Sequence, residues 1–306
     1  MSWRGRLEGI FCPSVPAARL AAVRVLVGGF ALVYLVARFP HLWRLSRFTA
    51  GQFRPTGVVH LLSSPLAPWQ WHALLIVTTL SALAFALGFR HRVLAPFFAL
   101  GFLFTLSYRN SWGMIFHTEN LMVLHVGILA LAPASHGFSL DARASKKDYA
   151  DSWYYGWPLV LMGIVTTAAY FLAGYAKLRH GGFSWASGEV LRNYVAMDNL
   201  RKLLLGDIYS PLAAPTMRFD VLFTVLASAS LALELLAPLS LFSRRFARLW
   251  VPGMVGFHLG IVLLMAIVFP SPLTGIAFVS FYRAELLLQR IATRWSQLRD
   301  KSRARA

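Results

Sequence analysis

Runs of about 20 mainly apolar residues recur along the chain, and they restrict its fold more than any other feature. An α-helix of that length rises about 30 Å, which is the thickness of the hydrocarbon core of a bilayer. Of the 306 residues, 57% are apolar and 14% are charged, against roughly 45–50% and about 25% in soluble globular proteins. This composition excludes an ordinary soluble enzyme. It predicts an all-α integral membrane protein.

The apolar runs predict a polytopic bundle of about eight transmembrane helices. Proline residues support the divisions, since Pro133 closes the fourth run and Pro270 with Pro272 separates the last two. The predicted domains are an N-terminal segment (1–18), the transmembrane domain (19–289) and a basic tail (290–306). The predicted spans are residues 19–38, 69–88, 93–111, 114–133, 155–176, 219–241, 247–269 and 272–289.

The distribution of Lys and Arg predicts the orientation of these spans. With the N-terminus in the cytoplasm, eighteen basic residues fall in cytoplasmic segments and eleven in outer ones, so the positive-inside rule favours two cytoplasmic termini. The long loops 39–68 and 177–218 would then face outward and either cover a site or serve as passive connections. The basic tail is expected to lie on anionic lipid, without nucleic-acid binding. We expect no cleaved leader and no lipidated Cys12.

Polar residues within the predicted spans are the candidate functional groups, because hydrocarbon makes them costly. In the fourth run, His117 and Asn120 share a helix face, whereas Glu119 points elsewhere. These residues would line a cavity or bond a neighbouring helix. No metal-ligand spacing is present, so we predict no metal site.

The end of the fifth run carries Tyr170, Gly174 and Lys177, which lie on one stripe of a helix. Gly174 would leave a notch between the phenol and the amine. Lys177 would either snorkel to the outer interface or, if it is buried, lose its proton more easily and act as a base.

Two further polar residues lie deep in apolar sequence, namely Glu234 in the sixth run and His258 in the seventh. A buried Glu234 must be protonated, paired with a base such as His258 or an arginine, or face a wet cavity. In the loop after the fifth run, Trp185, Tyr194 and Met197 would suit an interfacial helix on the outer leaflet.

The segment Tyr170-Phe171-Leu172-Ala173-Gly174-Tyr175-Ala176-Lys177-Leu178, followed by Trp185 and Gly188, resembles the most specific motif of the HTTM membrane domain. That family includes the membrane part of vitamin K-dependent γ-glutamyl carboxylase. Further similarity is found at Arg24-Val25-Leu26, at Phe53-Arg54-Pro55-Thr56-Gly57-Val58, at Glu234 with Pro238, and at Phe257-His258.

The resemblance implies that Lys177 is the base that deprotonates a reduced vitamin K or menaquinone-type quinol. With O2 the quinol would become an epoxide and generate a strong base, and CO2 is a possible further co-substrate. By the same resemblance His117 is a second catalytic residue, and the cofactor would contact Tyr170, Gly174, Asn120, Glu234, His258 and Trp185. The chain departs from the carboxylase in having Ala176 before Lys177, where the carboxylase has a second lysine.

Because the last predicted helix ends near residue 289, we expect no counterpart of the large extramembrane domain with which the carboxylase grips its substrate. The resemblance therefore favours a lyase-type, quinol-dependent membrane enzyme that acts on an exported peptide, a small substrate or a separate partner chain. A non-catalytic membrane partner in peptide maturation or export, and a lipid or ion carrier, are the alternatives. Arg-rich, Lys-poor usage favours the inner membrane of a high-GC bacterium as the location.

Overall fold

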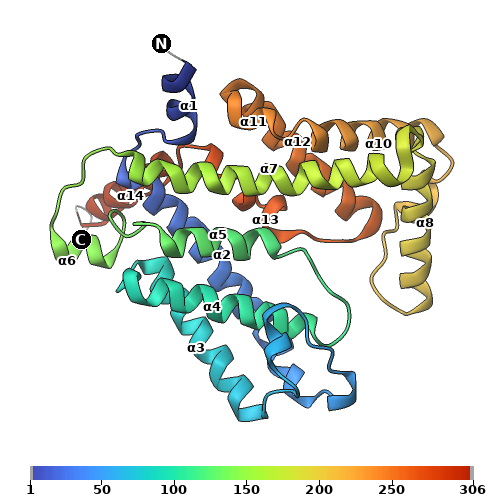
Figure 1. The fold of residues 1–306 in the computed structure, drawn as a ribbon, viewed down its shortest axis with the longest axis horizontal. Helices are drawn as coiled ribbons and strands as arrows, with labels where there is room; N and C mark the ends of the chain where they lie inside the picture. The colour runs from blue at the N-terminus through green and yellow to red at the C-terminus, as the bar shows by residue number, and fades with distance from the viewer. Residues whose placement is uncertain (1–2, 304–306) are drawn as a thin grey trace. The chain divides into compact units, whose positions relative to one another are not determined.

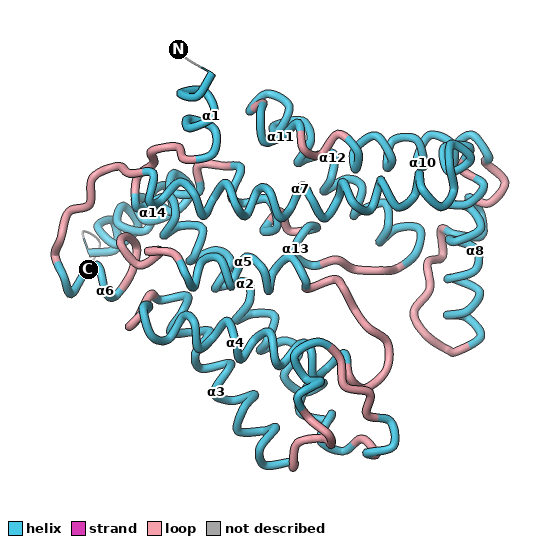
Figure 2. Tube along the Cα trace, viewed as in Figure 1, coloured by secondary structure: helices cyan, strands magenta, loops and turns pink. Residues whose placement is uncertain are grey.

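The computed structural model describes residues 3–303, and helices form nearly all of its regular structure (Figure 2). The only β interaction in these residues is an isolated antiparallel bridge between Val15 and Ser152. The α-helices are α1 (Trp3–Phe11), α2 (Ala17–Arg44), α3 (Pro68–Leu87), α4 (His91–Asn110), α5 (Asn120–Leu131), α6 (Leu140–Ser145), α7 (Trp153–Gly181), α8 (Glu189–Leu204), α9 (Ala213–Thr216), α10 (Asp220–Leu235), α11 (Leu239–Phe242), α12 (Arg244–Met265), α13 (Pro270–Leu273) and α14 (Ala284–Arg303). The 3-10 helices are η1 (Leu45–Arg47), η2 (Ala50–Gln52), η3 (Gly57–Leu61), η4 (Gly182–Ser187) and η5 (Ile276–Phe281).

Five helical segments of the described residues are long and apolar enough to cross a membrane. The apolar helix Asn120–Leu131 is shorter. These segments confirm an all-α membrane protein. The five are Ala17–Arg47, Pro68–Leu87, His91–Asn110, Trp153–Ser187 and Arg244–Met265.

Three predicted spans differ from the helices that form. The run 114–133 becomes a helix only from Asn120, so His117 and Glu119 precede it. The run 219–241 ends its first helix at Leu235 and resumes as α11, next to Pro238, whose ring excludes the helical hydrogen bond of an uninterrupted span.

The predicted last span, 272–289, is wrong as a continuous helix. Pro270 and Pro272 start the short α13, and Gly275 follows with a positive φ of 79°, a conformation that ends a helix. The 3-10 helix η5 comes next. The new helix α14 starts at Ala284 and runs through the predicted tail as far as Arg303.

The chain divides into two compact units. The first comprises the described residues up to Met162 and from Val279 onward, and the second comprises residues 163–278. In the first unit α2 packs against α3, α4 packs against α3 and α5, and α14 contacts α2. Its core contains large buried side chains such as Trp71, Phe98 and Tyr108.

A buried arginine organises the first unit. Arg24, in α2, has no exposed surface. Its guanidinium donates to the carbonyl oxygens of Phe85 (2.9 Å) and Ala86 (3.0 Å) at the end of α3, and to that of Phe138 (2.6 Å). The last carbonyls of a helix have no partner inside the helix, so Arg24 caps α3 from a neighbouring element. Arg24, one of the eighteen basic residues that the sequence places on the cytoplasmic side, is thus an internal contact.

In the second unit, α7 and η4 lie antiparallel to α10, and α8 runs across the ends of these helices (Figure 1). Gly188 makes the turn into α8 possible. Its φ is 88°, and a Cβ there would lie 2.4 Å from the carbonyl carbon of Phe223 and from the amide nitrogen of Thr224. Only glycine allows the two backbones to approach this closely.

Candidate functional site

The second unit contains six of the eight predicted site residues, namely Lys177, Tyr170, Gly174, Glu234, His258 and Trp185. The other two, His117 and Asn120, lie in the first unit and are exposed. Four of the six form two polar pairs. Trp185 lies beside Lys177, and Gly174 lies against Glu234.

The first pair joins α7 to α10. The Nζ of Lys177 lies 2.7 Å from each carboxylate oxygen of Glu234. The lysine side chain is 20% exposed and the glutamate side chain 4%. Lys177 therefore turns toward the protein and does not snorkel, and the partner of Glu234 is neither His258 nor an arginine.

The second pair joins α7 to α12. The hydroxyl of Tyr170 lies 2.9 Å from Nε2 of His258, and both residues are buried. Tyr170 also packs against Trp250, with ring centroids 5.8 Å apart. The indole of Trp250 in turn donates to the carbonyl of Leu233, one residue before Glu234. The two pairs are thus connected through the packing of α7, α10 and α12.

The notch predicted beside Gly174 is filled. A Cβ at this position would lie 2.9 Å from Cβ of Glu234 and 3.2 Å from the side chain of Leu235. The missing side chain lets α10 approach α7, as small residues do between membrane helices. The close approach brings the Glu234 carboxylate within reach of Lys177.

Aromatic rings surround the amine. The Nζ of Lys177 lies 5.1 Å from the ring centroid of Trp185, in η4, and 5.7 Å from that of Phe257, in α12. Both distances fall within the range of cation–π attraction. Phe257 lies eight residues before Met265, the last residue of α12. Eight residues of α-helix rise about 12 Å. The amine of Lys177 therefore lies beside α12 at about this distance from the end of the helix.

Two buried nitrogens of this region have no hydrogen-bond partner among the described residues, Nε1 of Trp185 and Nδ1 of His258. Buried polar atoms in native proteins are normally paired. An indole N–H is a donor, and the imidazole Nδ1 is a donor or an acceptor depending on the tautomer. Both nitrogens are therefore candidate hydrogen-bonding groups for a ligand.

The polar residues of the fourth run form a separate network in the first unit. Glu119 accepts hydrogen bonds from Tyr34 (2.9 Å), Arg109 (2.9 Å) and Thr118 (2.6 Å). The hydroxyl of Tyr34 also accepts from Arg109 at 2.6 Å. The sequence gives no indication that Arg109 pairs with Glu119. Arg109 and Glu119 are ten residues apart and are separated by a loop, so helical periodicity does not predict a contact between them.

A surface cavity of about 260 Å³ lies at the turn between η4 and α8, and it contains an ion pair between Arg192 and Asp220. None of the eight predicted residues lines it. Its lining residues are Ser187, Gly188, Glu189, Arg192, Asp220 and Phe223. No group of three or more potential metal-ligating side chains occurs within the part of the chain that the structure describes.

Comparison with known proteins assigns the family. Residues 13–284 match the HTTM domain. No curated protein and no solved structure matches the chain. The match covers the second unit completely, including Lys177, Glu234, Tyr170 and His258, and it confirms the resemblance found in the sequence. The chain belongs to the HTTM-domain family.

Proposed function

We propose that this protein is a membrane enzyme of the carboxylase type, in which Lys177 is a base toward a reduced naphthoquinone. The observation that supports the proposal best is the Lys177–Glu234 pair, a lysine and a carboxylate in contact inside an apolar bundle. Burial of a charged pair in such surroundings has a large desolvation cost. A hydrophobic pair of similar volume often gives the protein equal stability. The presence of two ionisable groups where apolar side chains would pack favours a chemical role.

Glu234 would convert Lys177 into a base without any change in net charge. The proton on Nζ moves to a carboxylate oxygen 2.7 Å away, and this leaves a neutral amine beside a neutral carboxylic acid. Low polarity reduces the free-energy cost of this transfer from the charged to the neutral pair, so the transfer can occur during the reaction. The neutral amine can then accept a proton from an acidic hydroxyl group, whereas an ammonium group cannot.

Reduced naphthoquinone fits the residues around this amine. Trp185 and Phe257 supply aromatic surfaces, and the unpaired nitrogens of Trp185 and His258 are available for the oxygen atoms of the ring. A quinol would supply the reducing equivalents for O2 and form an epoxide, and the reaction would generate a strong base. Tyr170 would hold the imidazole of His258 in one orientation through its 2.9 Å contact.

We further propose that both termini face the cytoplasm of a bacterium, that residues 177–218 lie on the outer side of the inner membrane, and that the modified substrate is an exported peptide or a small molecule. CO2 is a possible co-substrate. For His117 and Asn120, in the first unit, the resemblance is the only support for a functional role.

The alternative is a non-catalytic membrane partner in peptide maturation, and one observation favours it. The Lys177–Glu234 contact joins two helices that are already close at Gly174, so the pair also serves as a structural link. The two functions differ in whether quinol is consumed.

The test uses the full-length protein, purified in detergent and supplied with reduced menaquinone and O2. Bound quinone and epoxide are measured by mass spectrometry in the wild type, in Lys177→Met and in Lys147→Met, a control in which an exposed lysine is replaced. We expect epoxide from the wild type and the control, and none from Lys177→Met. Equal epoxide in all three samples contradicts a catalytic Lys177. Absence of both quinone and epoxide from the wild type favours the non-catalytic partner.

A further inference from the structure

Helix α8 has two faces of opposite character. Val195, Asn199 and Lys202 are buried on one side, with exposed fractions of 1%, 7% and 6%. On the opposite side Met197, Leu200 and Leu204 are 70%, 54% and 76% exposed, and at 100° per residue these three lie within one sector of the helix. We call Met197, Leu200 and Leu204 the outer face of α8.

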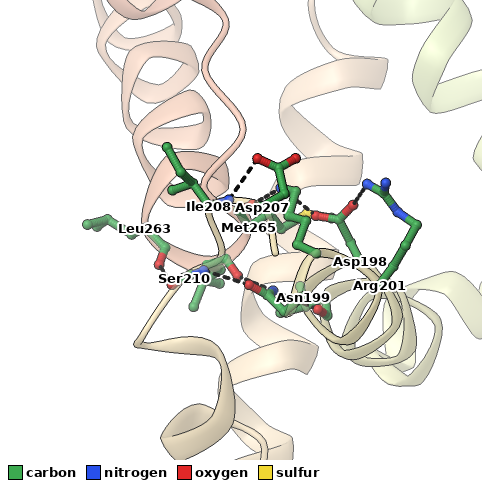
Figure 3. A network of polar contacts seen from close by, with 11 residues as sticks. Asp198, Asn199, Arg201, Asp207, Ile208, Ser210, Leu263 and Met265 are labelled. Carbon is green, nitrogen blue, oxygen red and sulfur yellow. Dashed lines mark hydrogen bonds and ion pairs between the residues drawn. The ribbon is translucent and has the colours of Figure 1, made fainter. Parts of the chain in front are cut away.

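The buried face of α8 caps the end of α12 (Figure 3). Asn199 donates to the carbonyl of Leu264 at 2.9 Å, Lys202 donates to that of Met265 at 2.5 Å, and Ser210 donates to that of Leu263. The side-chain oxygen of Asn199 also accepts from the amide of Ser210 at 2.7 Å. Three consecutive orphan carbonyls of a helix end are thereby satisfied.

The charge of Lys202 suits this position. A helix C-terminus carries a partial negative charge, and a cation there is favourable. Lys202 also pairs with Asp198 at 2.8 Å, and Arg201 contacts the same carboxylate at 2.8 Å. The burial of Asp198 raises its pKa, but the contacts with Lys202 and Arg201 together outweigh this, and its pKa lies below the ordinary value of 3.8. The network fixes α8 to α12.

This attachment places α8 at the boundary of the membrane. The 22 residues of α12 span about 33 Å, close to the roughly 30 Å of hydrocarbon, so its last carbonyls lie near the level where the headgroups begin. Helix α8 runs across the ends of α7 and α10 (Figure 1). Its 16 residues extend about 24 Å, which is too short to cross a bilayer.

Exposed apolar residues also occur on the helix to which α8 is attached. Leu259 and Leu263 on α12, a candidate membrane span, are each 47% exposed, and Ile208, in the loop after α8, is 79% exposed. An exposed apolar face marks a contact with a membrane or a partner. The attachment of α8 to the end of a candidate span favours the bilayer over a second protein chain.

We propose that α8 lies in the boundary between headgroups and acyl chains, with its outer face in the lipid and its buried face held against the end of α12. Because η4 leads directly into α8, the membrane contact also anchors the turn that carries Trp185 over Lys177. The inference concerns a membrane contact and does not depend on the catalytic role proposed for Lys177.

Spin labels in the full-length protein test this placement. In a Cys12→Ser background, a nitroxide is attached to Met197→Cys, Leu200→Cys or Leu204→Cys, and the protein is placed in nanodiscs of phosphatidylcholine and phosphatidylglycerol. Leu80→Cys, on the exposed surface of the candidate span α3, is the reference within the bilayer, and Lys147→Cys, in an exposed link, is the reference in water. Collisions with O2 and with a polar nickel complex measure depth.

We expect the ratio of O2 to nickel collisions at all three α8 positions to lie several-fold above that of Lys147→Cys and below that of Leu80→Cys. Ratios equal to that of Lys147→Cys place the outer face in water and overturn the proposal. Dipolar coupling between labels of different molecules, lost on dilution with unlabelled protein, shows a second copy on this face and also overturns it.

Discussion

Both carboxylate oxygens of Glu234 lie 2.7 Å from the Nζ of Lys177, although these residues are 57 positions apart in the chain. The symmetrical contact leaves the ammonium and the carboxylate fully engaged with each other. Its energetic consequence is testable apart from any activity, because the removal of one member of a buried pair exposes the cost of burying the other.

Replacement of Glu234 alone is expected to destabilise the protein strongly. In Glu234→Leu the Lys177 ammonium loses its partner, at a cost of about 3–5 kcal/mol for a buried pair. The double variant Lys177→Met/Glu234→Leu removes both charges and is expected to recover most of this loss. Thermal unfolding in detergent measures both changes. A double variant less stable than Glu234→Leu would contradict a charge-burial cost at this site.

Replacement of Gly174 tests the close approach of α7 and α10. The Cβ of Gly174→Ala would lie 2.9 Å from that of Glu234, so the helices must separate, and overpacking of this kind costs about 1–3 kcal/mol. Gly260→Ala in α12 is the matched control, since a Cβ there meets no atom within 4 Å. We expect a lower melting temperature for Gly174→Ala only. Equal melting temperatures for the two variants would show that the packing is looser than described.

The buried Arg24 is expected to be essential for the first unit. In Arg24→Met the carbonyls of Phe85, Ala86 and Phe138 lose its hydrogen bonds, and each buried group left unpaired costs about 1–3 kcal/mol. Arg92→Met removes an exposed charge of the same sign, from a neighbouring part of the chain, and should be tolerated. The yield of monodisperse protein and its melting temperature compare the two. Similar losses of yield and melting temperature in both variants would show that the effect comes from a change in membrane topology.

Protonation of Asp198 is expected to loosen Lys202, which binds the end of α12, and this effect should occur only in acid. Because the folded pKa of Asp198 lies below 3.8, the ionised form is the one that folding favours, and its contribution is complete above that pH. The contribution disappears as the pH falls through the lowered folded pKa. The mobility of a spin label at Leu200→Cys should therefore rise only below pH 3.8. With Asp198→Asn the label should be mobile at neutral pH and show no such transition, and an unchanged transition would exclude Asp198 as its origin.

The sequence by itself determined the membrane class and the family. These depend on the length and apolarity of the helical runs and on local motifs, and such features need no knowledge of distant contacts. The runs around α2, α3, α4, α7 and α12 formed single helices for this reason. The predicted last span failed because its average apolarity concealed the local effect of Pro270, Pro272 and Gly275.

Only the tertiary structure decided how the polar residues are paired. The stripe of Tyr170, Gly174 and Lys177 was visible in the sequence, but the filling of the gap at Gly174 by α10 and the partner of Lys177 were not. Likewise Arg24 and Lys202, which a charge count treats as signals of topology, are buried donors to the ends of other helices. A side chain's partner depends on which helix faces meet across long sequence separations, and a one-dimensional pattern does not record that.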